Sequence, residues 1–300
     1  MIRLAICALL ALTPGMAVAE TPTLLTWPDL TKRAQPKPDA TIAYGDDHLQ
    51  KVDVWMPTGD APRRGFPTVL MVHGGCWTTS IADRSLMNWI ANDLRRSGIA
   101  VWNIDYRGVD RSGGGYPGTF LDVAKASDAL LTHAKRYRLD TRRVVAVGHS
   151  AGGHLALWLA ARGRLPKDSV LHVAHPLKIA HVISLGGLPD LAATAASPDN
   201  GCGVEVVGKL VGAPSPARAD VYRDTSVPRL LPFGVGQDLV NGAEDRIIPL
   251  RLGTGYVAHA RAAGDRAELH VMPATGHVEL IAPESAAWAE AKRLIWAALR

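Results

Sequence analysis

The sequence lacks several features that would define other classes of protein. It has no low-complexity tract, no internal repeat and no block of basic residues. Hydrophobic residues make up 47% of the chain and charged residues 20%, which argues against a disordered or fibrous protein and fits a globular enzyme. A chain of 300 residues is within the range of one large α/β domain, so we expect a single domain.

The sequence also lacks an apolar segment long enough to cross a membrane. The apolar run Leu4 to Leu12 covers nine residues, too few for a helix that spans about 30 Å of hydrocarbon. Arg3 precedes this run, and Ala17-Val18-Ala19 offers small residues for cleavage. This pattern predicts a secretory signal over residues 1–19. We therefore expect residues 20–300 to be exported, to the periplasm or the medium, without membrane insertion.

Charge and cysteine content limit the partners and the covalent links. Without the signal, 32 basic and 28 acidic residues remain, spread along the chain with a net charge of +4, so nucleic acid is not an expected partner. Only Cys76 and Cys202 remain, and an oxidising compartment would preserve a disulfide between them. The sequence does not define the distance between their Cα atoms, so a bridge and two free, buried thiols both stay open.

Strand and helix patterns alternate along the rest of the chain. Alternating apolar and polar residues predict a half-buried strand at 50–56, with a partner at 42–44. Short apolar runs then predict strands buried on both faces at 68–72, 99–104, 144–147, 181–185, 235–240 and 268–272. Periodic stretches predict helices at 83–96, 120–137, 151–162, 250–263 and from 284 onward. This order predicts an α/β fold, with a mostly parallel, doubly wound sheet of about eight strands and helices on both faces.

Residues 186–232 break this rhythm. They contain many proline, alanine and glycine residues and one short helix candidate at 204–211. We interpret them as a short, cap-like insertion above the sheet.

One motif predicts a nucleophile. Gly148-His149-Ser150-Ala151-Gly152 stands between the strand at 144–147 and the helix at 151–162, the strand–turn–helix context of a nucleophile elbow. Such a turn strains the backbone of the serine, and a Cβ at either flanking glycine would crowd it. We predict Ser150 as the nucleophile, with His149 beside it at the substrate pocket.

A serine hydroxyl needs a base with a pKa near neutrality, and that base needs an acid to orient it. After an elbow serine, the acid and then the histidine follow in the chain. The loops after the last two predicted strands supply Asp245 and His277, and we predict these two residues as acid and base. The competing residues are two acids and five histidines: Glu244, Asp190, His149, His154, His172, His175 and His181.

Amide donors for the developing oxyanion are expected after the strand at 68–72. This strand leads into Val72-His73-Gly74-Gly75-Cys76-Trp77, where two glycines let backbone amides approach a substrate oxygen. We predict the amides of Gly75, Cys76 and Ala151 as donors, the last at a helix N-terminus. Loss of one such donor typically costs about 2.7–4 kcal/mol of barrier.

No metal or cofactor is expected. None of the 11 histidines occurs in a metal-ligand spacing such as HExxH. Gly113-Gly114-Gly115 is not followed by the GK[ST] of a phosphate loop, so we interpret it as a flexible loop.

Together these motifs resemble the esterase/lipase branch of the α/β-hydrolases, over roughly residues 40 to 298. The motifs are His73-Gly74-Gly75-Cys76-Trp77, Asp105-Tyr106-Arg107, the Ser150 elbow, Asp245 and Gly276-His277. HGGxW in place of HGGG is similar to the kynurenine formamidase and carboxylesterase-like subgroup. The resemblance implies a Ser-Asp-His triad without a cofactor and an ion pair between Arg107 and Asp122. Where the sequence departs from the HGGG pattern, with Cys76 and Trp77, we expect Trp77 to line the acyl pocket.

The primary hypothesis is therefore an exported serine hydrolase that cleaves small to medium soluble carboxylic esters through an acyl-enzyme. The short insertion does not suggest a full lipase lid. The first alternative is an amidase or arylformamidase with the same triad, although export fits poorly with a cytoplasmic metabolic substrate. The second is a binding protein on an inactivated hydrolase scaffold, which a complete triad disfavours.

Overall fold

An eight-stranded sheet forms the centre of the protein, in the order β1-β2-β4-β3-β5-β6-β7-β8. This computed structural model describes residues 23–300, so the expected signal segment lies outside the described residues. The strands are β1 (Ala40–Ala43), β2 (Lys51–Trp55), β3 (Phe66–Val72), β4 (Ala100–Ile104), β5 (Leu139–His149), β6 (Ile179–Leu185), β7 (Gly236–Gly242) and β8 (Ala267–Met272). β2 pairs antiparallel with β1 and β4, and every other pair is parallel. The predicted fold class is confirmed.

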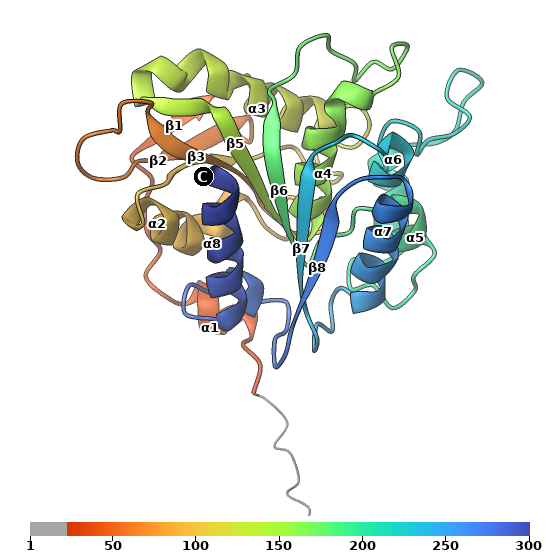
Figure 1. Ribbon diagram of the computed structural model, residues 1–300. Coiled ribbons are helices and arrows are strands. Elements are labelled where there is room, and N and C mark those ends of the chain that lie inside the picture. Colours follow the sequence, from red (N-terminus) through yellow and green to blue (C-terminus); the bar gives the residue numbers. More distant parts are fainter. Residues whose placement is uncertain (1–22) are drawn as a thin grey trace, which may run out of the picture.

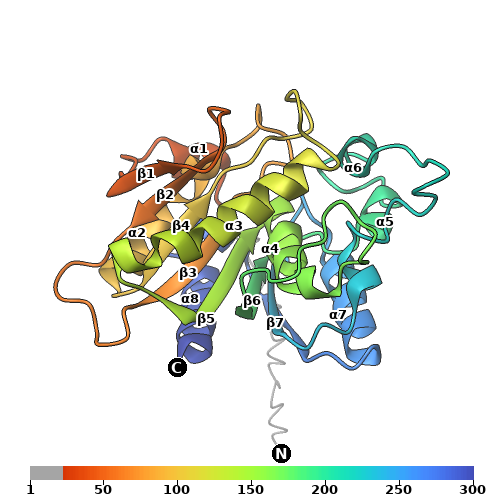
Figure 2. The same ribbon diagram turned by 90° about the horizontal axis from the view of Figure 1, so that it is seen from above.

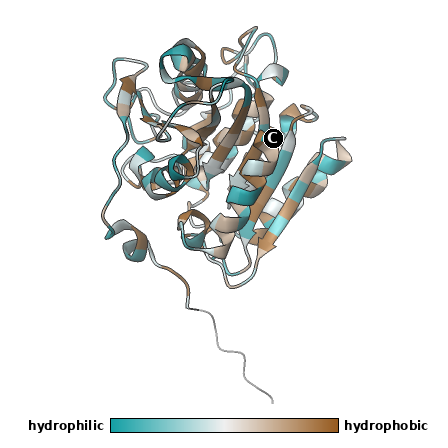
Figure 3. Ribbon diagram, turned by 60° about the vertical axis from the view of Figure 1, so that its left-hand side comes forward, coloured by the Kyte–Doolittle hydropathy of each residue, from teal (hydrophilic) through white to brown (hydrophobic). Residues whose placement is uncertain are grey.

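Helices cover both faces of this sheet (Figures 1 and 2). Alternate residues of β3 show the division, because Leu70 and Val72 pack in one apolar core while Val69 and Met71 pack in the other. The first core includes side chains of α3 (Gly118–Tyr137), α4 (Ala151–Ala161) and α7 (Leu250–Ala262). The second includes side chains of α2 (Asn88–Arg96) and α8 (Ala286–Leu299). Two buried faces explain why the central strands are continuous apolar runs, seen as brown stretches in Figure 3.

The segment between β6 and β7 contains α5 (Leu191–Ala195), α6 (Glu205–Val211) and the 3-10 turn η3 (Val227–Leu230). It is anchored to α4, a helix with almost every residue buried. Trp158 Nε1 donates to the Asp224 carbonyl at 2.8 Å, and His154 Nε2 lies 2.8 Å from the Thr225 carbonyl. Burial lowers the pKa of His154 to about 4, so this imidazole is neutral at pH 7 and Nε2 carries its proton.

Three local features differ from the sequence expectations. The helix expected at 83–96 begins as the 3-10 turn η1 (Arg84–Met87), which the Asp83 carboxylate caps by accepting from the Ser85 amide. β5 begins at Leu139, five residues before the predicted apolar run. A short helix, α1 (Trp27–Thr31), was not predicted. Two further 3-10 turns are η2 (Arg162–Arg164) and η4 (Glu279–Ile281).

Within residues 23–300, none of the helices is both long and apolar enough to cross a bilayer.

Candidate active site

The turn from β5 into α4 holds Ser150 in a strained conformation. Its backbone angles are φ 54° and ψ −123°, a region that side chains rarely adopt. A Cβ at position 148 would lie 2.0 Å from the Gly152 carbonyl oxygen, and one at position 152 would lie 2.2 Å from that of Val72. Glycine is therefore required at both positions, as the sequence argument for an elbow assumes.

Asp245 and His277 lie together beyond the carboxyl ends of β7 and β8. His277 Nδ1 is 2.6 Å from Asp245 Oδ2, and both side chains are almost completely buried. The other oxygen of the carboxylate, Oδ1, accepts from the amides of Ile247 and Ile248 at 2.8 Å each. A carboxylate in this position keeps the imidazole proton on Nδ1 and leaves Nε2 as an acceptor.

Ser150 and His277 line one cavity of about 290 Å³. In the described part of the chain no hydrogen bond joins the Ser150 hydroxyl to His277 Nε2, and such catalytic bonds are often long before substrate binds. The three residues predicted as nucleophile, base and acid are thus brought to one edge of the sheet: His277 is paired with Asp245 and shares a cavity with Ser150.

The amides predicted as oxyanion donors adjoin this cavity. Gly75 and Cys76 line it, and Ala151 is the first residue of α4. Across residues 23–300, none of these three amides donates a hydrogen bond to a backbone carbonyl. They are therefore available for an oxygen atom of a substrate.

The loop that carries Gly75 and Cys76 is supported by His73. His73 Nε2 lies 3.0 Å from Asp105 Oδ1, and Arg84 Nη1 donates to Asp105 Oδ2 at 2.8 Å. The Tyr106 ring stacks on the imidazole with 4.3 Å between ring centroids. A Cβ on Gly74 would come within 3.0 Å of the Ser150 Cβ, so this loop packs directly on the elbow.

A disulfide joins this loop to the insertion. Cys76 and Cys202 are bonded, with 5.3 Å between their Cα atoms. Of the two possibilities left open by the sequence, the structure contains the bridge. It closes a long loop, since 126 positions separate the two cysteines, and it connects a candidate oxyanion donor to the segment that follows α5.

The expectation that Trp77 borders the acyl pocket is wrong. Its side chain is fully buried, and its indole Nε1 donates to His154 Nδ1 at 3.2 Å. Trp77 has a positive φ of 54°, which directs the side chain into the core against α4 instead of toward Ser150. Its role is to hold the oxyanion loop against the helix that follows the nucleophile.

His149 lines the cavity beside Ser150. Its ring lies 4.4 Å from that of His277, between centroids, and its Nε2 is 3.2 Å from the His277 carbonyl oxygen. Burial, reinforced by the neighbouring His277, holds the pKa of His149 well below its usual range. The neutral ring therefore donates to the backbone of His277 and supports its position.

The sequence argument missed the amino-terminal wall of the cavity. Trp27 on α1 lines it, and its indole makes edge contacts with His149 and His277, at 6.1 Å between centroids in each case. The signal for α1 was available in Thr26-Trp27-Pro28-Asp29, since a threonine three residues before an acid marks a helix start. Both the amide and the hydroxyl of Thr26 donate to Asp29 Oδ2 at 2.7 Å.

Glu279 fastens this segment to the histidine loop. Its buried carboxylate accepts hydrogen bonds from the amides of Leu25 and Gly276, the latter at 3.0 Å. Six further cavity residues were also not predicted: Thr31, Ile81, Ala82, Leu86, Gly201 and Ile247. None of these residues belongs to a recognisable motif.

The competing acids have other positions. The Asp190 side chain accepts from the Ala193 amide and caps α5. Glu244 is exposed beside Asp245. The ion pair expected between Arg107 and Asp122 is present, at 2.8 Å.

This sheet order, with a strained serine between β5 and α4, defines the protein as an α/β-hydrolase. The particular family is shown by the sequence, because residues 52–251 match the model of the BD-FAE family. The chain belongs to that family.

Two curated relatives are similar over part of their length. Esterase LipC of Mycobacterium tuberculosis is 25% identical over 242 residues, which cover 79% of this chain and 58% of the relative. Ethyl acetate hydrolase of Pseudomonas putida is 28% identical over 123 residues, which cover 41% of this chain and 37% of the relative. The chain therefore spans less than two thirds of either relative.

Solved structures share the fold. Esterase B from Lactobacillus rhamnosis aligns with a TM-score of 0.68 and 17% identity, over 89% of this chain and 88% of that one. A bacterial heroin esterase aligns with a TM-score of 0.66 and 22% identity, over 87% of this chain and 83% of that one.

Proposed function

We propose that this protein is an exported serine hydrolase that cleaves small carboxylic esters. The observation that carries the proposal is the buried pair of His277 and Asp245, 2.6 Å apart, at the same cavity as the strained Ser150. A side-chain pair of this kind beside a serine hydroxyl is the arrangement that activates a weak nucleophile.

The reaction has two halves. His277 Nε2 removes the proton from Ser150 Oγ as the oxygen attacks the ester carbonyl carbon, and Asp245 stabilises the imidazolium that forms. The tetrahedral intermediate collapses, the C–O bond to the alcohol breaks, and His277 returns the proton to the departing alcohol. Water then attacks the acyl-enzyme with His277 as base, which releases the acid and restores the Ser150 hydroxyl.

The carbonyl oxygen becomes negatively charged in both tetrahedral intermediates. The free amides of Gly75, Cys76 and Ala151 would donate to it, and the N-terminus of α4 adds favourable partial charge. These groups are held before the substrate arrives, by the Asp105 contacts of His73 and by the Cys76 disulfide. Little reorganisation is then needed in the transition state.

The size and the lining of the cavity support the proposal that the substrate is small. Its volume of about 290 Å³ lies at the lower end of the range for small-molecule sites. Apart from the catalytic groups, much of its lining is apolar: Trp27, Ile81, Ala82, Leu86 and Ile247. The curated relatives are named as an esterase and an ethyl acetate hydrolase. These names support a small soluble ester as substrate over an emulsified lipid.

Export is part of the proposal. It is supported by the signal pattern at residues 1–19 and by the bridge between Cys76 and Cys202, since disulfides persist in oxidising compartments.

The alternative is an amidase or arylformamidase with the same triad. An amide nitrogen must be protonated as it departs, whereas an alcohol is a better leaving group, so matched substrates separate the two. We expect purified protein to hydrolyse p-nitrophenyl acetate and butyrate with a much higher kcat/KM than the matching p-nitroanilides or N-formyl anilines. Faster turnover of the anilides or formyl compounds would favour the alternative, and no turnover of any of them would refute the hydrolase proposal.

Trp27 is expected to limit the length of the acyl chain. Trp27 lines both the 290 Å³ cavity and a second cavity of about 500 Å³, and His277 borders both as well. Trp27→Ala should therefore raise the kcat/KM for p-nitrophenyl octanoate relative to the acetate by about fivefold or more, since each added methylene that becomes buried contributes about 0.8 kcal/mol.

The matched control is Trp296→Ala, which removes an indole from α8, outside the cavity. The measurement is kcat/KM for p-nitrophenyl esters of increasing acyl length, for both variants and the wild type. An unchanged profile for Trp27→Ala would show that α1 does not bound the acyl site.

A further inference from the structure

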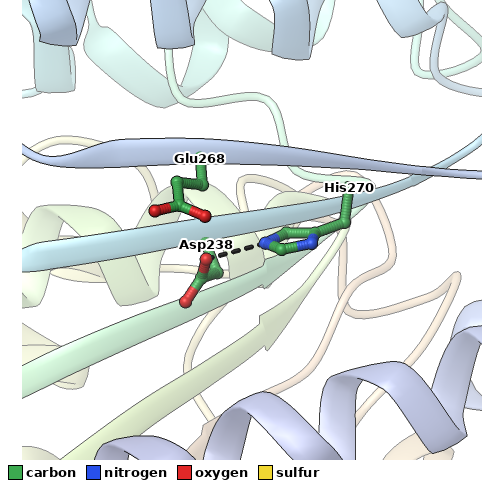
Figure 4. Close-up of side chains that lie close together, drawn as sticks. All are labelled: Asp238, Glu268 and His270. Atoms are coloured by element: carbon green, nitrogen blue, oxygen red, sulfur yellow. Dashed lines mark hydrogen bonds and ion pairs between the residues drawn. The ribbon is translucent and has the colours of Figure 1, made fainter.

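We propose that Asp238, Glu268 and His270 bind one divalent transition-metal cation, with Zn²⁺ as the representative ion. One ligand atom from each of the three side chains lies within 4.8 Å of the other two. Asp238 and Glu268 are direct neighbours on β7 and β8, and His270 is two residues further along β8. The three side chains therefore share one face of the sheet, and Figure 4 shows them turned toward one another.

This cluster is separate from the hydrolase site. Asp238 precedes Gly242, the last residue of β7, by four positions, or about 13 Å at roughly 3.3 Å per residue. Ser150, Asp245 and His277 all lie beyond the carboxyl ends of their strands. The proposed cation thus has no contact with the reacting atoms.

Neighbouring side chains hold the ligands in orientation. His181 Nε2 lies 2.6 Å from Asp238 Oδ2, and His270 Nε2 lies 2.8 Å from Asp238 Oδ1. On its other side, His270 Nδ1 faces Glu290 Oε1 at 3.4 Å. Nε2 is hydrogen-bonded to Asp238 without an ion, so a bound ion would take the place of that hydrogen bond. The imidazole proton would then lie on Nδ1, beside the Glu290 carboxylate, and Nε2 would bind the metal. His270 Nε2 and Asp238 Oδ1 are then the two atoms that face the ion.

The distances need only a small adjustment. Zinc bonds to nitrogen and carboxylate oxygen are about 2.0–2.2 Å in tetrahedral sites, so two ligand atoms lie roughly 3.4 Å apart. Asp238 Oδ1 and His270 Nε2 would separate by a few tenths of an ångström from 2.8 Å. The flexible, exposed Glu268 side chain can supply the third ligand, and two carboxylates with one imidazole suit Zn²⁺ or Mn²⁺.

The surroundings leave room for water as a fourth ligand. The cluster borders a cavity of about 420 Å³ that also has three arginines in its wall, Arg143, Arg266 and Arg293. Two of them have acceptors of their own: Arg143 donates to the Ala298 carbonyl at 2.7 Å, and Arg293 forms an ion pair with Glu290 at 2.7 Å. Arg266 is the remaining positive charge, and it makes phosphate the competing ligand that a test must include.

The test is calorimetric titration of the chelator-treated, dialysed protein with ZnCl₂ at pH 7.5. We expect one ion per chain, and we expect His270→Gln and Glu268→Gln each to weaken binding at least tenfold. The control is His259→Gln, an exposed histidine on α7, which should bind as the wild type does. Hydrolysis of p-nitrophenyl acetate should be unchanged in all three variants, so this result is independent of the proposed function.

Three results would overturn the site. They are the absence of binding at about 1 mM Zn²⁺, equal affinity of the wild type and His270→Gln, and binding of inorganic phosphate in place of the cation.

Discussion

Ser150→Ala is expected to lower kcat for p-nitrophenyl acetate by about 10⁴- to 10⁶-fold. Alanine retains the Cβ, so the strained turn at φ 54° is kept, but no oxygen remains to form the acyl-enzyme. The residual rate would come from substrate binding and from the amides of Gly75, Cys76 and Ala151, which do not depend on the hydroxyl.

The measurement is initial rates together with a thermal unfolding curve for wild type and variant. The unfolding midpoints should nearly coincide, which shows that the loss is chemical. His277→Ala alone and the double variant should lose about as much as Ser150→Ala, because residues that act as one unit are not additive. Equal rates for wild type and Ser150→Ala would remove the mechanism.

Asp245→Asn is expected to lower kcat by about 10⁴-fold. The amide oxygen of asparagine can still accept from Ile247 and Ile248, whose amides lie 2.8 Å from Asp245 Oδ1. Its NH₂ group then faces His277 Nδ1, which lies 2.6 Å from the native Oδ2. Nδ1 must become the acceptor, the imidazole proton moves to Nε2, and the ring can no longer accept the Ser150 proton.

The matched control for this variant is Glu244→Gln, the same change of a carboxylate to an amide one residue earlier. Glu244 is exposed, so we expect nearly wild-type kcat and an unchanged unfolding midpoint. A loss of similar size in Glu244→Gln, with Asp245→Asn active, would transfer the orienting role to Glu244. Loss in neither variant would show that no carboxylate orients His277.

Local sequence patterns were sufficient for the sheet. Alternation at 50–56, its partner at 42–44 and the six apolar runs that follow located all eight strands. Burial of one face repeats at every second residue, and burial of both faces gives a continuous apolar run. The glycines of the elbow could also be interpreted from the sequence, because the contacts that require them are local. The contacts that exclude a Cβ at Gly148 are made by Gly152, only four residues away.

The direction in which loop side chains point could be predicted less well from the sequence. The prediction for Trp77 failed because the sequence does not state on which side of a loop with positive φ a side chain emerges. The indole instead enters the core against His154, 77 residues further along the chain. Trp27 was missed for a related reason, since its position over His277 depends on Glu279, which binds the Leu25 amide from the far end of the chain.

By itself, the sequence determined the order of strands and helices, since the position of each element follows from interactions between near neighbours. It therefore also determined which residues stand at each strand end. Only the tertiary structure decided which strand ends meet. It paired Cys76 with Cys202 and placed Trp27 over the cavity. It also brought His181, Asp238 and His270 from three strands onto one face. Such contacts depend on which strands, loops and helices become neighbours in space, and no local pattern encodes that arrangement.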